Sequence, residues 1–129
     1  MKLVNLTPHS IVLQGPDGDR IVVPPAGQLA RVASQPGTRL DEAGDYEGAP
    51  CPLYGAPNWG AVEGLPAYEP GTILIVSALV AGQSRRYDVF SPGTGPNDGA
   101  IREPDELPVG YPNPRKGQIV AVTRLIRAG

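Results

Sequence analysis

The sequence predicts a mainly β domain, α+β at most, with one short helix and long loops rich in glycine and proline. Short segments of β-branched and aliphatic residues recur about every ten residues, and Gly-rich or Pro-rich turns separate them. Aromatic residues make up only 5% of the chain, so Val, Ile, Leu and Ala have to supply most of the core, and this composition favours strands. We expect a small mixed or antiparallel sheet, or a barrel-like arrangement of strands.

The length of the chain fits one domain. A chain of 129 residues can bury a core without disulfide bonds. Its 17 glycines and 16 prolines reach the level found in disordered proteins. Compact apolar runs such as TILIVSALV at 72–80 lie between them, however, and disordered chains lack such runs. We therefore expect a single folded domain over residues 1–129.

The first third of the chain alternates short β-type segments with tight turns. The segments KLVNL, IVLQ, RIVVP and LARVAS span residues 2–6, 11–14, 20–24 and 29–34. The turn GPDGD separates the second segment from the third at hairpin spacing, so residues 10–24 are expected to form an antiparallel hairpin. PPAG at 24–27 then ends the strand, because proline cannot donate a hydrogen bond to a ladder.

Residues 35–70 form the longest stretch without a clear periodic pattern. Apolar residues are sparse in this stretch, and glycine and proline are frequent. Because a compact domain rarely carries so long an irregular segment without a use, we expect either a functional loop or an exchanged arm that contains short strands. WGAVEGLP at 59–66 is the best strand candidate in it. Trp59 is expected to anchor the loop on the core rather than to stack on a ligand.

The second half of the chain contains a buried strand and the one segment with helical character. TILIV at 72–76 is a continuous apolar run, which is typical of a strand buried on both faces. SALVAGQ follows, with Ser77 as the cap of a short helix and Gly82 as its end. RYDVF at 86–90 is expected to be a short strand and QIVAVTRLI at 118–126 a long closing strand.

Charge and cysteine content argue against several classes of function. The net charge is −2 and the basic residues are spread along the chain, which argues against general nucleic-acid binding. One cysteine and one histidine form neither an internal disulfide nor the usual zinc site, so we expect no metal and no cofactor. The longest apolar run falls far short of the roughly 20 residues of a membrane span. We expect no signal peptide, no contact with membranes and a cytoplasmic location.

The stretch FSPGTGPNDGAIR, residues 90–102, is the first candidate site. Its glycines allow successive backbone N–H groups to face an anion, and its prolines fix φ and so preorganise the loop. The guanidinium of Arg102 would pair with the anionic group. The stretch matches neither the P-loop nor the dinucleotide fingerprint, and the alternative is an irregular connection between strands. The residues expected to bind a ligand here are Ser91, Gly93, Thr94, Gly95, Asn97 and Arg102.

The turn NLTPHS, residues 5–10, is the second candidate. Pro8 presets a turn, and the polar side chains around it can hydrogen-bond their own backbone, so one interpretation is a capped turn between two strands. The other interpretation places Thr7 and His9 in the same anion pocket as Arg102. Because no nucleophile or paired carboxylate accompanies His9, we expect no catalytic residue.

Four motifs give the chain a resemblance to a group of known proteins. They are NLTPHSIVL at the start, VEGLP ahead of PGTILIVSALVA, then DVFSPGTGP, and GQIVAVTRL near the end. With these motifs the chain resembles a set of small proteins from bacteriophages and high-GC bacteria that share an NLTPH start and a PGTGP loop. The resemblance covers most of the chain and implies a phage-type protein, but it brings no residue roles with it.

A donor-rich pocket without catalytic residues favours a binding function. For a phage-type protein, we expect the sequestration of a phosphorylated, nucleotide-like signal of host defence in the host cytoplasm. One alternative is a structural protein that decorates a phage head, with residues 35–70 as an exchanged arm. Another is a small hydrolase of nucleotide-type substrates, in which His9 would act with Asp88 or Asp98. We also expect a homo-oligomer, because a chain with so much loop needs a partner surface.

Overall fold

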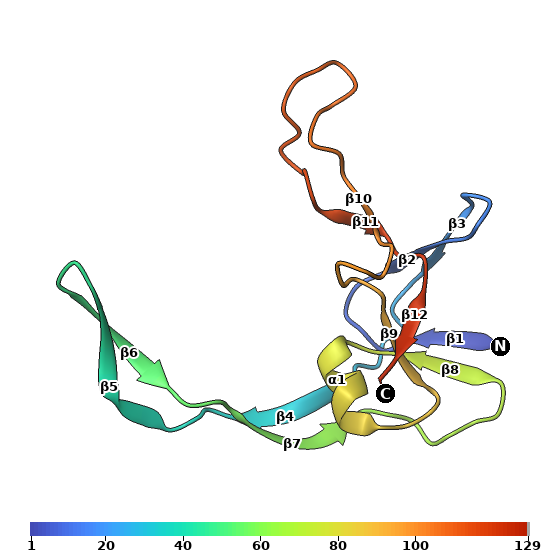
Figure 1. The fold of residues 1–129 in the computed structure, drawn as a ribbon. Helices are drawn as coiled ribbons and strands as arrows, with labels where there is room; N and C mark the ends of the chain where they lie inside the picture. Colours follow the sequence, from blue (N-terminus) through green and yellow to red (C-terminus); the bar gives the residue numbers. More distant parts are fainter. Residues whose placement is uncertain (129) are drawn as a thin grey trace.

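The computed structural model describes residues 1–128, and a four-stranded sheet lies at its centre (Figure 1). The strand order is β1-β8-β9-β12, with bounds Lys2–Asn5, Thr72–Ile75, Val89–Pro92 and Leu125–Arg127. The first three strands are parallel, and β12 is antiparallel to β9. Strands make up 45% of the chain, which confirms the prediction of a mainly β fold with a mixed sheet. The sheets of the described chain do not close into a barrel.

The helix α1, Ala78–Ser84, connects the parallel strands β8 and β9. Ser77 caps it as predicted, since its Oγ accepts a hydrogen bond from the N–H of Val80 at 3.3 Å. The prediction that the helix ends at Gly82 is wrong. Val80 and Ala81 are buried in the core, and the helix continues past Gly82 to Ser84, after which Arg85 takes the left-handed conformation with which the helix ends.

Two hydrophobic clusters cover opposite faces of the sheet. On one face, Leu74 packs with Val80 of α1. On the other face, Ile75 packs with Ile11 and Val122. Because successive side chains of a strand point to opposite faces, β8 supplies residues to both clusters. This confirms the prediction that the TILIV segment is buried on both faces.

Two antiparallel pairs flank the central sheet. β2 (Ile11–Gln14) and β3 (Arg20–Val23) form the predicted hairpin, with GPDGD as its turn. β10 (Ile101–Arg102) pairs with β11 (Ile119–Ala121). A bridge between Leu13 and Val122 joins the hairpin to the segment that leads from β11 to β12.

The prediction of one long closing strand at 118–126 is wrong, because the chain changes partner within it. The N–H of Val122 donates to the carbonyl of Val12 at 2.8 Å, on the side of the hairpin. β12 then pairs with β9 in the central sheet. A segment that passes from one sheet to another bends at the change, so it is divided into β11 and β12.

The strand predicted at 86–90 begins later than expected. Arg86 and Asp88 bind each other through their side chains across a turn, and β9 begins only at Val89. The strand then continues to Pro92, into the glycine-rich stretch. The first residues of the candidate loop are therefore part of the sheet.

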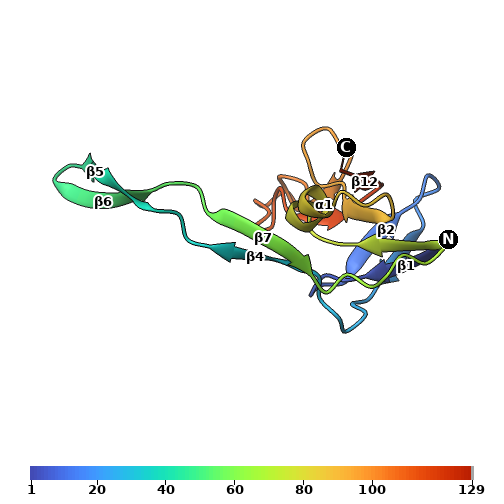
Figure 2. The same cartoon turned by 90° about the horizontal axis from the view of Figure 1, so that it is seen from below.

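Residues 31–63, here called the arm, project away from the body as two antiparallel ladders in series (Figures 1 and 2). β4 (Arg31–Gln35) pairs with β7 (Asn58–Glu63) next to the body, and β5 (Arg39–Tyr46) pairs with β6 (Ala49–Tyr54) at the tip. This confirms that the segment contains short strands, including one at Trp59. The prediction that Trp59 anchors the segment on the core is wrong, since its side chain is 45% exposed on β7.

The arm is fixed to the body only at its base. Val32 and Val62 lie opposite each other in β4 and β7 and pack against the hydrophobic cluster under α1. In the tip ladder, by contrast, no residue of β5 or β6 is buried. The core therefore stabilises the first ladder and gives no cover to the second.

Candidate functional site

The two stretches singled out in the sequence leave the central sheet at the same edge. β1, β8 and β9 are parallel, with Asn5 opposite Ile75 and Ile75 opposite Phe90. The turn NLTPHS follows β1 and the glycine loop follows β9, so both lie at the carboxyl edge, where open parallel sheets commonly bind ligands. β8 separates them. Among the described residues, no hydrogen bond or ion pair joins His9 to the glycine loop.

Asn5 organises the NLTPHS turn, and it is one of the polar residues that the capped-turn interpretation expected to bond the backbone. Its side chain is buried, and its Nδ2 donates to the carbonyls of His9 at 2.8 Å and Val23 at 3.0 Å. Its Oδ1 accepts from the N–H of Thr7 at 3.0 Å and from the Thr7 hydroxyl at 2.6 Å. The amide thus uses both donors and its acceptor. His9 itself is exposed, and a ligand-binding role for Thr7 and His9 stays a prediction.

Two backbone donors of the glycine loop already have partners within the protein. The N–H of Gly93 donates to the carbonyl of Arg124 at 3.0 Å, and the N–H of Gly95 donates to Oδ2 of Asp98 at 2.8 Å. The carboxylate of Asp98 therefore takes the position that an anionic ligand would take at Gly95. Of the other predicted residues, Ser91 is buried in β9, whereas Thr94 and Asn97 are exposed.

Arg102 also has partners in the loop region. Its Nη1 donates to the carbonyl of Gly117 at 2.8 Å, and its Nη2 donates to the carbonyl of Thr94 at 3.2 Å. The guanidinium thus ties the glycine loop to the segment before β11. An anion that paired with Arg102 would compete with these two bonds, and this pairing stays a prediction.

A more basic site lies at the opposite edge of the sheet, where β9 begins. An open hollow of about 740 Å³, here called the arginine hollow, is lined by Gly82, Arg85, Arg86, Tyr87, Arg127 and Ala128. Three of these residues are supplied by the turn between α1 and β9, and Arg127 is supplied by β12. The pairing of β9 with β12 is what brings the C-terminal arginine beside the other two.

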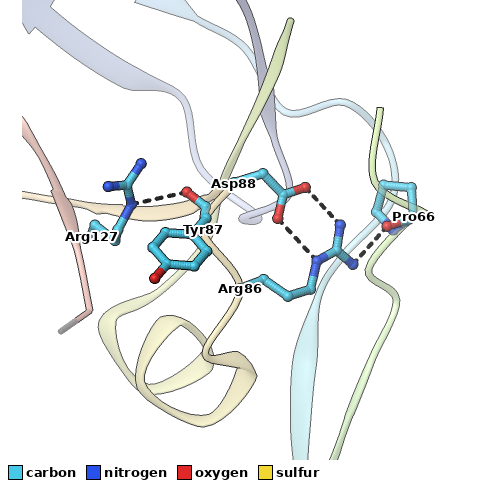
Figure 3. A network of polar contacts seen from close by, with 5 residues as sticks. All are labelled: Pro66, Arg86, Tyr87, Asp88 and Arg127. Carbon is cyan, nitrogen blue, oxygen red and sulfur yellow. Dashed lines mark hydrogen bonds and ion pairs between the residues drawn. The ribbon is translucent and has the colours of Figure 1, made fainter. Parts of the chain in front are cut away.

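Figure 3 shows how one of the three arginines is held. Nε and Nη2 of Arg86 donate to the two carboxylate oxygens of Asp88, at 3.0 and 2.7 Å, and Nη1 donates to the carbonyl of Pro66 at 2.9 Å. Asp88 is buried, while the Arg86 side chain is 30% exposed. This bidentate pair is neutral as a unit. The positive charge of the arginine hollow is therefore that of Arg85 and Arg127.

Arg127 is held against aromatic rings. Its Cζ lies 5.2 Å from the ring centroid of Tyr87 and 4.9 Å from that of Phe90. Its Nε donates to the carbonyl of Tyr87 at 3.0 Å (Figure 3). Within residues 1–128, this Nε is the one guanidinium nitrogen of Arg127 that has a hydrogen-bond partner. Tyr87 is 80% exposed. The guanidinium of Arg127 is therefore held in place beside the exposed ring of Tyr87.

Arg85 has a backbone conformation that favours glycine. Its φ is 55° and its ψ is 22°, at the position where helices most often have glycine. The left-handed conformation costs a residue with a Cβ about 1–2 kcal/mol. The side chain forms no salt bridge with any residue of 1–128. Strain of this kind is concentrated at functional sites in proteins, which makes Arg85 a candidate ligand-binding residue.

Replacement of Arg85 by glycine is therefore expected to raise the free energy of unfolding by about 0.5–1 kcal/mol. The backbone strain that glycine removes from the folded state is larger than the stability lost because glycine gives the unfolded chain more entropy. Urea denaturation would measure the change. Arg85→Lys keeps both the charge and the strain, so its stability should stay at the wild-type value. A loss of stability in Arg85→Gly would mean that the guanidinium stabilises the fold, and it would remove this reason for assigning the residue to a site.

A hollow at the β2–β3 hairpin suits an anion less well. This hollow of about 420 Å³ lies between the β2–β3 turn and residues 123–125, and Asp17 and Asp19 contribute carboxylates to its lining. Within residues 1–128, no three His, Cys, Asp or Glu side chains gather as a metal site requires. In the same residues, no helix has the length and hydrophobicity needed to cross a membrane. No family model, no curated protein and no solved structure matches the chain.

Proposed function

We propose that the protein binds a small anionic ligand with an aromatic group, such as a nucleotide, in the arginine hollow and does not transform it. The observation that carries the proposal is the combination of two cationic side chains that form no ion pair within residues 1–128, Arg85 and Arg127, with the exposed ring of Tyr87 in one hollow. The volume of about 740 Å³ lies within the range of roughly 300–1,000 Å³ that is usual for ligand sites.

The proposed ligand follows from the chemistry of these side chains. A guanidinium matches the geometry of a phosphate and binds it through two parallel hydrogen bonds. An exposed tyrosine ring offers a surface on which a base can stack. Arg127 is already fixed by its two ring contacts and its bond to Tyr87, so it loses little entropy when a ligand binds.

Binding without catalysis is supported by the acid and base groups near the hollow. Within residues 1–128, Asp88 lines the neighbouring hollow together with Arg85 and Arg86, and both of its oxygens accept hydrogen bonds from Arg86. A general base has to reach the proton that it removes, whereas this carboxylate is buried and directed at Arg86. His9 lies at the other edge of the sheet, so its placement gives the hydrolase alternative no support.

The biological form of the proposal rests on the resemblance to phage proteins. A phage protein that binds a nucleotide tightly and leaves it unchanged would lower the concentration of a signal of host defence in the host cytoplasm. The binding site needs only affinity for this role, and no turnover. A structural role in a phage particle is the second candidate, and the extended arm is the observation that favours it.

The test is calorimetry with inorganic phosphate and a panel of mono-, di- and cyclic nucleotides. For a panel member that binds, Arg127→Ala is expected to weaken binding by about 1.5–3 kcal/mol, roughly ten- to a hundredfold in Kd. Arg102→Ala is the matched control, because it removes one guanidinium at the other edge of the sheet. If only Arg102→Ala lowers the affinity, the ligand binds at the glycine loop instead. A wild-type protein that binds no panel member would contradict the proposal.

A further inference from the structure

The chain exposes more surface than its mass predicts. Its accessible surface is 9167 Å², whereas a compact monomer of 13.5 kDa exposes about 6,500 Å². The excess of about 2,600 Å² is larger than the roughly 800 Å² that each partner buries in a standard protein interface. The chain therefore has enough uncovered surface for a stable interface.

The tip of the arm is the part of the fold that most lacks cover. A two-stranded ladder by itself is at best marginally stable in water, because it has no second layer in which to bury side chains. β5 and β6 have no buried residue. Figures 1 and 2 both show this ladder far from the central sheet, so the body of the same molecule does not cover it.

One face of the tip ladder carries a group of apolar side chains. Tyr46 lies opposite Ala49 and Gly44 lies opposite Cys51 in the register of β5 and β6. Because side chains alternate between the two faces, Tyr46, Cys51 and Leu53 lie on the same face. The side chain of Leu53 covers Gly44: a Cβ atom built on this glycine would lie 3.7 Å from Cδ2 of Leu53. Tyr46 is 78% exposed and Leu53 is 39% exposed. An apolar face of this kind is normally covered by another layer.

The charge distribution indicates what covers this face. Residues 39–54 contain one arginine and four carboxylates, a net charge of −3, whereas the whole chain has −2, so the rest of the chain carries +1. Two tips placed side by side would repel each other. The negatively charged tip of one copy and the positively charged body of another attract each other. In a dimer with a twofold axis, this contact between tip and body occurs twice.

We propose that the arm is a self-association element: a second copy of this chain covers the apolar face formed by Tyr46, Cys51 and Leu53, and the acidic tip of each copy lies against the body of the other. The interface is isologous, so each molecule contributes an arm and receives one. The proposal is independent of ligand binding in the arginine hollow.

Sedimentation velocity over a micromolar concentration series tests the proposal. Wild-type protein is expected to have at least the mass of a dimer. Leu53→Lys places a charge on the apolar face and should raise the dissociation constant at least about tenfold. Ala43→Lys is the matched control, because it adds the same charge to the same ladder on the opposite face, and it should leave the mass unchanged. Added salt should weaken association.

Cys51 reports on the same face without a mutation. It is the only cysteine in the chain and is exposed in the isolated copy, so a thiol reagent should react slowly with it in the associated protein and faster on dilution. This readout holds even if Leu53→Lys unfolds the tip. A monomeric wild type, a Cys51 rate that is independent of concentration, equal effects of the two lysine variants, or association that salt strengthens would each overturn the proposal.

Discussion

Replacement of Asn5 by alanine is expected to lower the free energy of unfolding by about 3 kcal/mol, because a buried side chain with four hydrogen bonds is lost. The carbonyl of Val23 and the N–H of Thr7 lose their partner, whereas the carbonyl of His9 keeps the hydroxyl of Thr7, at 3.0 Å. His9 is exposed, so water can replace part of the hydrogen bonding that is lost at its carbonyl. The loss of unfolding free energy therefore stays below the sum for four buried hydrogen bonds. Urea denaturation with an unchanged m value would measure it.

Two further variants separate the parts of this network. Thr7→Ala removes only the hydroxyl and is expected to cost about 1 kcal/mol. Asn5→Asp keeps the acceptor for Thr7 but places a carboxylate against two carbonyl oxygens, so it should cost at least as much as Asn5→Ala. If Asn5→Ala costs less than Thr7→Ala, the amide does not hold the turn in the way described.

Removal of the Asp88 carboxylate is expected to have the second large effect, a loss of about 2–3 kcal/mol in Asp88→Ala. The variant leaves Arg86 without its bidentate partner while the guanidinium remains partly buried beside Pro66. Because the Arg86 side chain is 30% exposed, the cost falls below that of a fully buried pair. Thermal and urea denaturation would both show the loss.

The same variant is expected to change ligand binding in the opposite direction. Without Asp88, Arg86 adds an uncompensated positive charge to the arginine hollow, so an anion should bind more tightly while the fold becomes less stable. Calorimetry and denaturation of one protein preparation would compare the two effects. The double variant Arg86→Met/Asp88→Leu should be more stable than Asp88→Ala, because no unpaired charge remains. Equal stability of the two variants would contradict the assignment of the cost to an unpaired arginine.

The parts of the fold that were predicted correctly are those that local patterns determine. The β2–β3 hairpin follows from turn chemistry between two apolar runs, and the Ser77 cap follows from one side-chain oxygen near the start of a helix. The strands of the tip ladder were not predicted individually, because Pro50 and Pro52 interrupt the pattern of β6. That strand pairs on one side only, and an edge strand tolerates alternate prolines that lack a donor.

The candidate site was harder to predict, because it depends on contacts between distant parts of the chain. Arg85 and Arg127 lie far apart in the sequence, and only the pairing of β9 with β12 brings them together. In the glycine loop, Asp98 of the same chain accepts the hydrogen bond of the Gly95 N–H, and anion binding by this loop stays a prediction. A carboxylate three residues after Gly95 was the available signal for this internal bond.

The parallel pairing of β1 with β8 has a consequence for the order of events during translation. β1 is made first, but residues 72–75 leave the ribosome several seconds later, at a synthesis rate of roughly 5–20 residues per second. The ladders of the arm join neighbouring segments, and hairpins close within about 1–10 μs. Residues 31–63 are therefore all synthesised while the first strand still waits for a partner, but their base ladder gains the cover of the hydrophobic cluster under α1 only when the central sheet assembles.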